Sequence, residues 1–234
     1  MKKSIIIPTY NEKENIIKVI PMIKSLGIKD LHILVVDDNS PDGTGAVVDS
    51  LAVQDEKLHI VHRKNKEGLG RAYLAGFSWA LEHGADLIFE MDADLSHDPK
   101  HIPEFIEASK NFDLVLGSRY VRGGGIKNWN FFRKVISRFG NIYAGFILGV
   151  PVLDLTGGYK CYKRHVLEAI DFDAVASLGY NFQIETTYMV YKKGFTVKEI
   201  PIIFTERRHE KSKFDIKIMF EGFWRVIILK IKGF

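Results

Sequence analysis

The sequence predicts an α/β protein built on a doubly wound, mostly parallel sheet with flanking helices. Short apolar segments, typical of buried strands, alternate along the chain with stretches of helical periodicity roughly 10 to 15 residues long. Three of the apolar segments end in polar residues, at 9–12, 37–40 and 92–94. Because ligands bind beyond the carboxyl ends of parallel strands, we expect one crevice to collect all three polar groups.

The composition is that of an ordinary globular protein. The chain has 234 residues, 46% hydrophobic and 26% charged, which is enough for one large core or two small ones. Its 33 basic and 29 acidic side chains give a net charge of +4, which permits an anionic partner, and no nucleic-acid partner is expected. The single cysteine, Cys161, excludes an internal disulfide and fits a reducing compartment.

The first half of the chain shows the strand and helix patterns most clearly. Apolar, β-branched segments predict strands at Ser4–Pro8, Leu31–Val36 and Leu58–His62. Apolar residues at helical spacing predict helices from about residue 12, through 47–51 and from about 71 to 83. We expect Asn11 to cap the first helix and Gly84 to end the third.

The second half continues the same alternation. Strands are predicted from Leu87, at 114–117, at 154–159 and at 197–204, and helices after Pro99, over 128–148 and over 181–193. The adjacent glycines at 157 and 158 predict a close approach of the backbone to a neighbouring segment.

Two helices combine apolar and basic residues. Both the segment 128–148 and the segment from about 215 to the end carry an apolar stripe with basic side chains beside it. Such a stripe suits either a protein core or the headgroup region of a lipid bilayer. No apolar run reaches the roughly 18 to 20 residues of a membrane-spanning helix, and the first run is too short for a secretory signal. We therefore predict one domain over 1–214 and an amphipathic helix over 215–234.

Asp92 and Asp94 are the first candidate site. They follow a buried apolar run and are separated by one residue, so a bend at the strand end would let both carboxylates converge. Carboxylate oxygens suit Mg²⁺ or Mn²⁺, and these ions bridge the oxygens of a diphosphate. The alternative is a pair of solvated acids at the start of a loop. The polar ends of the neighbouring strands favour the metal site.

Phosphate groups would have to be bound without a glycine-rich phosphate loop. Neither G-x-G-x-x-G nor G-x-x-x-x-G-K-[ST] follows the first strand, which disfavours a dinucleotide oxidoreductase and a P-loop NTPase. Arg119 and Arg122 in a glycine-rich loop, and the basic loop 205–213, supply cationic side chains instead. Glu185 is a candidate catalytic base on a predicted helix, although a glutamate on a helix surface is usually only solvated.

Several motifs, in order along the chain, carry a family resemblance. They are Ile6–Glu12 (IIPTYNE), Val35–Thr44 (VVDDNSPDGT), Met91–His97 (MDADLSH), Gly117–Tyr120 (GSRY) and Ser212–Lys213. Together they resemble the dolichyl- or polyprenyl-phosphate mannose synthases, which are inverting family-2 glycosyltransferases with a GT-A fold. The resemblance implies an enzyme that transfers mannose from GDP-mannose to dolichyl or polyprenyl phosphate with inversion.

The resemblance also implies a role for each matching position. Pro8, Tyr10, Glu12, Val35 and Asp37 would hold the nucleoside of GDP-mannose. Asp92, Ala93 and Asp94 would bind the diphosphate, with Asp92 and Asp94 as ligands of Mg²⁺ or Mn²⁺. Arg119, Arg207 and Lys213 would contact donor and acceptor phosphates, and Arg133 and Ser137 would lie near the lipid phosphate. Asp94, Arg119 and Arg133 are the predicted catalytic residues.

The chain departs from the family pattern at two positions. Ser96 stands where some members have a metal-ligating glutamine, and Glu210 stands where a glycine usually precedes Ser-Lys. A water molecule is expected to replace the glutamine on the metal ion.

The predicted location is the cytoplasm, at the cytoplasmic face of a membrane, through peripheral contact or a membrane-anchoring partner protein. Two alternatives stay open: a polyprenyl-phosphate glycosyltransferase that uses a UDP-sugar such as UDP-glucose, and a non-catalytic subunit that binds nucleotide sugars.

Overall fold

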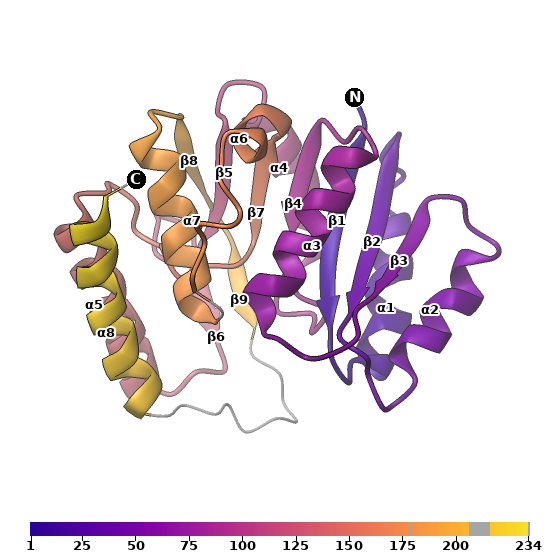
Figure 1. Cartoon of the computed structure of the whole chain (residues 1–234), viewed down its shortest axis with the longest axis horizontal. Coiled ribbons are helices and arrows are strands. Elements are labelled where there is room, and N and C mark those ends of the chain that lie inside the picture. The colour runs from indigo at the N-terminus through magenta and orange to yellow at the C-terminus, as the bar shows by residue number, and fades with distance from the viewer. Residues whose placement is uncertain (178, 206–215, 234) are drawn as a thin grey trace.

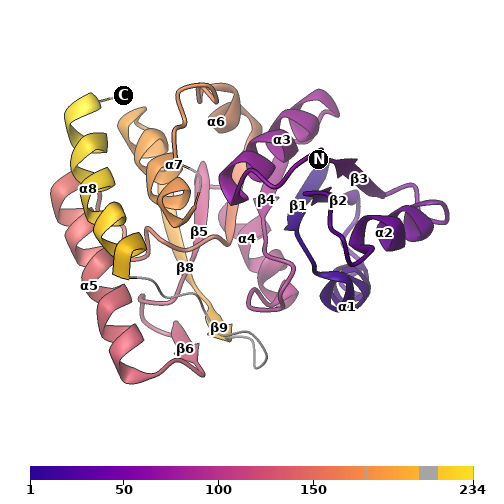
Figure 2. The same cartoon turned by 60° about the horizontal axis from the view of Figure 1, so that its bottom comes forward.

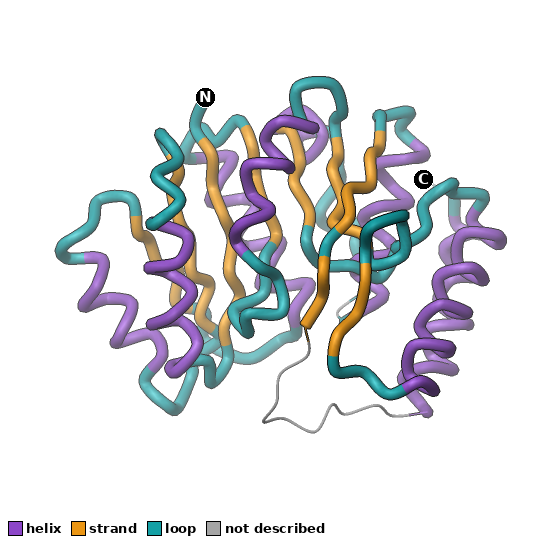
Figure 3. The backbone as a smooth tube through the Cα atoms, turned by 180° about the vertical axis from the view of Figure 1, so that it is seen from behind, coloured by secondary structure: helices purple, strands orange, loops and turns teal. Residues whose placement is uncertain are grey.

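The computed structural model describes residues 1–177, 179–205 and 216–233. A seven-stranded sheet with the order β3-β2-β1-β4-β7-β5-β8 forms its centre, and helices cover both faces (Figures 1 and 3). The strands are β1 (Lys3–Thr9), β2 (Leu31–Asp37), β3 (Leu58–His62), β4 (Leu87–Glu90), β5 (Leu114–Ser118), β7 (Lys160–Lys163) and β8 (Val197–Pro201). Strand β7 runs antiparallel to its neighbours β4 and β5, and the other pairs are parallel. The predicted α/β class and the mostly parallel sheet are therefore confirmed.

The helices fall into two layers. The described elements are α1 (Lys13–Lys24), α2 (Thr44–Ala52), α3 (Leu69–Glu82), α4 (Ile102–Ala108) after the short 3₁₀ helix η1 (Pro99–His101), α5 (Phe131–Leu148), α6 (Arg164–Glu168), α7 (Tyr180–Lys192) and α8 (Ile216–Lys232). Because side chains alternate along a strand, Ile6 joins one core with α3 and α7, whereas Ile5 and Ile7 join the other with α1 and α4. Gly76 lets α3 approach β1 closely, since a Cβ there would lie 2.4 Å from the Ile6 side chain.

Helices α5 and α8 lie side by side at one edge of the molecule (Figures 1 and 2). The Tyr143 hydroxyl donates a hydrogen bond to the Phe223 carbonyl oxygen at 3.1 Å, and the two rings meet edge to face at 4.7 Å. Lys230 donates to the carbonyl oxygen of Leu148 at 3.4 Å. In the described part of the chain, no helix is both long and apolar enough to cross a membrane. The predicted domain boundary at 214/215 lies outside the described residues and stays a prediction.

The start of α1 differs from the prediction. Glu12, not Asn11, precedes the first helical residue, and neither side chain caps the helix. The segment between β2 and α2 and the first residue of α2 supply the acceptors instead: the Glu12 amide donates to Thr44 Oγ1 at 3.1 Å, and the Lys13 amide donates to Asp42 Oδ2 at 3.1 Å. Asn11 takes a left-handed turn with φ of 60°, so its side chain is not placed to cap. The first two strand exits are thereby fastened together.

Two further strand predictions are wrong in detail. Residues 154–159 form no strand, and β7 begins at Lys160. The predicted close approach does occur, since a Cβ on Gly157 would lie 3.2 Å from the Gly117 carbonyl oxygen. The predicted strand 197–204 is divided: β8 ends at Pro201, which has no amide to donate, and β9 (Ile203–Thr205) pairs with β6 (Gly125–Lys127) in a separate two-stranded sheet.

Candidate active site

The exits of β1, β2 and β4 share one edge of the sheet. These strands are neighbours, and Thr9 pairs with Asp37 across β1 and β2, where Thr9 Oγ1 donates to Asp37 Oδ1 at 3.0 Å. On the other side of β1, the Met91 amide donates to the Ile6 carbonyl oxygen at 3.1 Å. The three polar segments therefore lie at the carboxyl edge of the sheet as predicted, and the single crevice around them stays a prediction.

The loop after β2 is ordered by two buried aspartates. Asp37 accepts hydrogen bonds from the amide and the hydroxyl of Ser40, at 3.0 and 2.6 Å. Asp38 accepts from Arg63 at 2.6 Å. Burial raises the pKa of Asp38 above its usual value, although the Arg63 charge and hydrogen bond oppose the shift. Both carboxylates thus hold the loop in shape at the edge where a nucleoside is predicted to bind.

The predicted nucleoside contacts lie on β1, β2 or the turn between β1 and α1: Pro8, Tyr10, Glu12, Val35 and Asp37. The ammonium of Lys66 lies 3.7 Å from the centre of the Tyr10 ring, which is 37% exposed. Glu12 is nearly buried and accepts a hydrogen bond from Asn15 at 2.7 Å. Val35 lies two residues before Asp37, the last residue of β2, and its side chain is fully buried. These ligand contacts stay predictions.

Asp92 and Asp94 lie on the turn that leaves β4. The Tyr73 hydroxyl donates to Asp92 Oδ1 at 3.1 Å, and the Asp92 side chain is 33% exposed. Asp94 Oδ1 accepts from the amide of Ser96 at 2.9 Å and also from its hydroxyl. Leu95 takes φ of 63°, a left-handed conformation that bends the chain immediately after Asp94. Ala93 between them is buried, so the backbone of the turn is fixed while both carboxylates stay partly exposed.

The turn that carries Asp92 and Asp94 fits a divalent cation whose coordination is completed by ligands from outside the protein. The described residues contain no group of three or more His, Cys, Asp or Glu side chains placed to hold a metal ion. Two carboxylates offer only oxygen, which suits Mg²⁺ or Mn²⁺, and such ions keep waters and take substrate phosphate oxygens as their other ligands. Asp92 and Asp94 are thus suited to an ion that also binds a diphosphate.

The last residue of β4, Glu90, belongs to a buried hydrogen-bond network that also contains Lys160. Glu90 accepts from the Tyr162 hydroxyl at 2.8 Å and from Gln183 at 2.7 Å. Lys160 donates to the Gln183 carbonyl oxygen at 2.9 Å and to Thr186 at 3.1 Å. Burial raises the pKa of Glu90 and lowers the pKa of Lys160 to about 8. Glu90 and Lys160 were not predicted from the sequence, although a glutamate inside an apolar run was a signal for a buried polar partner.

Arg119 is held by a residue that the sequence analysis did not select. Its Nε donates to Asp154 Oδ2 at 2.7 Å, and its Nη2 donates to Asp154 Oδ1 at 2.6 Å. Nη2 also donates to Thr156 Oγ1 at 2.7 Å. Side-chain exposure is 7% for Arg119 and 0% for Asp154, so this is a buried bidentate pair. Asp154 therefore fixes the direction of the Arg119 guanidinium.

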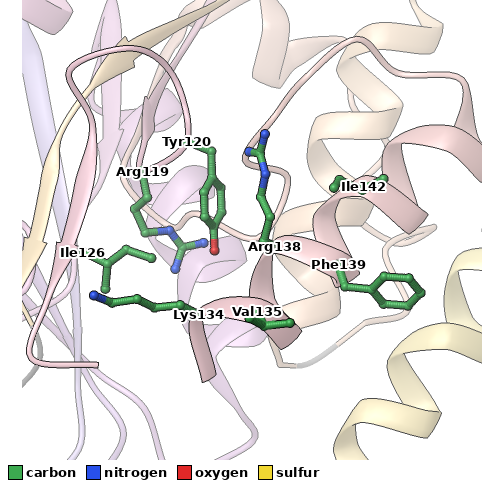
Figure 4. Close-up of a pocket in the computed structure, with 8 residues that line it drawn as sticks. All are labelled: Arg119, Tyr120, Ile126, Lys134, Val135, Arg138, Phe139 and Ile142. Carbon is green, nitrogen blue, oxygen red and sulfur yellow. The ribbon is translucent and has the colours of Figure 1, made fainter. Parts of the chain in front are cut away.

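A pocket of about 560 Å³ lies beside Arg119, between the β5 exit, β6 and α5 (Figure 4). Its wall combines cationic and apolar side chains: Arg119, Tyr120, Ile126, Lys134, Val135, Arg138, Phe139 and Ile142. The Tyr120 hydroxyl donates to Ser137 Oγ at 2.7 Å, which places Ser137 directly behind the wall. Arg133 does not line the pocket, and its guanidinium lies 4.0 Å from the Trp129 ring.

One aromatic ring connects this pocket with the Asp92 turn. Phe204 of β9 lies 5.5 Å from the Arg119 guanidinium and 6.0 Å from the His97 ring. His97 Nδ1 accepts the Asp92 amide at 3.1 Å. The structure thus brings Asp92, Asp94 and Arg119 into one region. Arg207 and Lys213 lie outside the described residues.

Glu185 is not part of this region. It is buried and accepts the amides of Ala176 and Ser177, at 3.3 and 2.9 Å. Its carboxylate therefore fastens the segment before α7 and is not available as a catalytic base.

The sequence matches a family model over most of its length and known proteins over nearly all of it. Residues 4–171 match the family described as Glycosyl transferase family 2. The chain is 47% identical over 231 residues to a polyprenol monophosphomannose synthase of Mycolicibacterium smegmatis, covering 98% of this chain and 87% of that protein. It is 45% identical over 213 residues to an undecaprenyl-phosphate mannosyltransferase of Micrococcus luteus, covering 91% and 87%.

Solved structures share the fold at low sequence identity. Glucosyl-3-phosphoglycerate synthase of Mycobacterium tuberculosis, in complex with UDP, superposes with a TM-score of 0.70 at 18% identity, covering 99% of this chain and 80% of that one. A mannosyltransferase of Pyrobaculum calidifontis, in complex with GDP-Man and Mn²⁺, gives 0.67 at 19% identity, covering 100% and 65%. The chain has a GT-A-like fold and belongs to glycosyl transferase family 2, a family of glycosyltransferase enzymes.

Proposed function

We propose that this glycosyltransferase transfers mannose from GDP-mannose to a polyprenyl phosphate such as dolichyl phosphate, with inversion at the anomeric carbon. Two relatives at 47% and 45% identity carry names that state mannosyl transfer to a polyprenol or undecaprenyl phosphate. The single structural observation that carries the proposal is the pocket beside Arg119, because it offers cations for a phosphate and apolar side chains for the lipid attached to it.

The donor would bind along the carboxyl edge of the sheet. The nucleoside would lie against the β1 and β2 exits near Tyr10 and Asp37, and the diphosphate would reach the turn that carries Asp92 and Asp94. A bound Mg²⁺ or Mn²⁺ supplies positive charge that stabilises the departing nucleoside diphosphate. Asp92 and Asp94 would hold that ion, and Tyr73 and Ser96 keep their carboxylates oriented.

The acceptor phosphate would enter from the pocket. Arg119, fixed by Asp154, would direct its guanidinium at the phosphate, and Lys134 and Arg138 of α5 line the same pocket (Figure 4). These cations reduce the repulsion between two phosphorylated substrates. A lipid phosphate is largely doubly ionised at neutral pH, since its second pKa is about 6 by analogy with phosphorylated side chains. No general base is then needed, which agrees with the structural role of Glu185.

We also propose peripheral contact with the cytoplasmic face of a membrane through α5. Large apolar side chains on one side of this helix are exposed: Phe131, Phe132, Val135, Phe139, Ile142 and Phe146. They form a continuous stripe at helical spacing, and Lys134 and Arg138 border it. Trp224 and Ile231 of the neighbouring helix α8 are exposed as well. An apolar stripe with basic neighbours suits the interface of an anionic bilayer, from which a lipid acceptor could enter the pocket.

A direct assay tests the proposed reaction. Purified protein is incubated with Mn²⁺ or Mg²⁺, radiolabelled GDP-mannose and a polyprenyl phosphate, and the label in the lipid phase is counted. UDP-glucose and other labelled donors are assayed in parallel. Transfer from GDP-mannose supports the proposal, whereas transfer from a UDP-sugar alone would favour the alternative donor. Binding of nucleotide sugar without any transfer would favour a non-catalytic subunit, and failure to bind vesicles would favour an anchoring partner protein.

A further inference from the structure

His97 is placed to control the geometry of the Asp92 turn. Its Nδ1 accepts the Asp92 amide at 3.1 Å, and its Nε2 lies 3.8 Å from Asp92 Oδ2. One imidazole therefore faces both the backbone and the carboxylate of the same residue. Because Nδ1 is an acceptor here, it carries no proton in this arrangement. The hydrogen bond fixes the backbone at the point where β4 ends and the turn begins.

The imidazole is itself held firmly. His97 is 3% exposed, and its ring stacks on Tyr159 with centroids 4.9 Å apart and planes within 14°. The Phe204 ring meets it edge-on at 6.0 Å. Tyr159 directly precedes β7 and Phe204 lies on β9, so the ring joins the turn to two distant segments.

We propose that His97 is a positioning residue for the divalent ion: it holds the Asp92 amide and thereby presents the Asp92 and Asp94 carboxylates together. This inference rests on the metal site in the proposed function. Groups that orient metal ligands typically change metal affinity by about 10- to 100-fold when they are removed. The hydrogen bond, more than the aromatic surface, should matter for the ion, because it acts directly on the Asp92 backbone.

Two substitutions separate the hydrogen bond from the ring. In His97→Asn the side-chain oxygen is the same number of bonds from Cα as Nδ1, so it can still accept the Asp92 amide. In His97→Phe the ring still stacks on Tyr159, but the acceptor is lost. His101→Phe serves as a matched control, because His101 is a nearly buried histidine on the next segment whose Nδ1 faces Glu104.

Manganese affinity is the readout. Mn²⁺ is titrated into the full chain in the presence of GDP, free Mn²⁺ is followed by electron paramagnetic resonance, and thermal unfolding is recorded for each variant. We expect His97→Phe to weaken Mn²⁺ binding about 10-fold or more. The Mn²⁺ affinity of His97→Asn should stay within about three-fold of the wild-type value, and His101→Phe should have the wild-type affinity. Should His97→Phe lose its cooperative unfolding transition, His97→Gln takes its place with the same expected loss, because its amide reaches the position of Nε2 and not of Nδ1.

The outcomes distinguish this inference from the proposed function. If the wild-type chain with GDP binds no Mn²⁺, the proposed metal site fails and the role of His97 fails with it. If the wild type binds Mn²⁺ and the folded acceptor-free variant binds it equally well, only the role of His97 is overturned. Equal losses in His97→Asn and His97→Phe would also overturn it, because the ring and not the hydrogen bond would then matter.

Discussion

Arg119 and Asp154 form a buried bidentate ion pair between the β5 exit and the loop before β7. Two guanidinium nitrogens donate to the two carboxylate oxygens at 2.7 and 2.6 Å, and the Arg119 amide donates to Oδ2 at 2.9 Å. Glu199 fastens the loop from below, since it accepts the amides of Leu153 and Asp154, both at 2.9 Å. The direction of the Arg119 side chain is thus set by a segment 35 residues further along the chain.

The first prediction concerns this pair. Asp154→Asn removes the charge and one acceptor, so the buried guanidinium loses its partner. Breaking a buried pair in this way typically costs about 3 to 5 kcal/mol. We expect a loss of that order in the free energy of unfolding, measured by urea denaturation, and a raised KM for polyprenyl phosphate. The exposed Asp173 provides the control substitution, Asp173→Asn, which should change neither quantity. Wild-type stability in Asp154→Asn would show that the pair contributes little.

The second prediction concerns the pocket wall. Arg138 lines the pocket and lies 4.9 Å from the Tyr120 ring. Arg138→Gln removes one cation that would face the acceptor phosphate, and a charged hydrogen bond is worth about 1.5 to 3 kcal/mol. We expect the KM for polyprenyl phosphate to rise about 10-fold or more while the KM for GDP-mannose stays unchanged. Lys18→Gln on α1 removes the same charge from an exposed site and should change neither. A rise in the donor KM instead would assign the pocket to the donor.

The third prediction concerns the exposed stripe on α5. Phe146 is 84% exposed, so Phe146→Ser removes apolar surface without opening a cavity in the core. Inserting a phenylalanine into an apolar phase is worth about 1.5 to 3 kcal/mol, so partition onto anionic vesicles should fall about 10-fold or more. The matched control is Val53→Ser, at a residue that is 86% exposed beyond the end of α2. Equal vesicle binding by Phe146→Ser and wild type in a sedimentation assay would exclude this face as the membrane contact.

The fourth prediction concerns stability at mildly acidic pH. His32 on β2 and His59 on β3 have ring nitrogens 3.0 Å apart, and their rings stack. Burial lowers the pKa of both below the ordinary 6.5, and the neighbouring His32 lowers the pKa of His59 further. The unfolded chain therefore binds protons more readily, so the free energy of unfolding should fall as pH drops from about 6.5 through the lowered values.

Urea denaturation at pH 7.5 and pH 5.0 checks this pH dependence. The loss of stability between the two pH values should be larger in the wild type than in His59→Gln, which has no imidazole at that position to protonate. The same loss in both proteins would show that other groups cause it.

The sequence predicted most of the central sheet because its strands are short apolar runs that require no long-range information. Ser4–Pro8 and Leu58–His62 are examples, and their structural counterparts differ by at most one residue at each end. Strand β6 could not be found this way, because Gly125–Lys127 has no apolar alternation and becomes a strand only by pairing with β9. The division at Pro201 depends on the same distant pairing.

Site residues that belong to a local sequence motif could be predicted, whereas those brought together only by tertiary contacts could not. Asp92, Asp94 and Arg119 stand out as local patterns, and the structure places them after β4 and β5, the two strands that flank β7. Asp154 and His97 become informative only through contacts with Arg119 and Asp92 that no spacing in the sequence reveals. The pocket likewise joins residues of β5, β6 and α5, so its existence depends on tertiary packing.

The most direct test measures mannose transfer by Asp94→Ala, because in the proposed reaction the Asp92 and Asp94 carboxylates hold the ion against the diphosphate. Labelled GDP-mannose, Mn²⁺ and polyprenyl phosphate are incubated with wild type and variant, and circular dichroism confirms that the variant is folded. We expect label to enter the lipid with the wild type and Asp94→Ala to transfer none above background. Transfer by folded Asp94→Ala at the wild-type rate would contradict this role of the carboxylates.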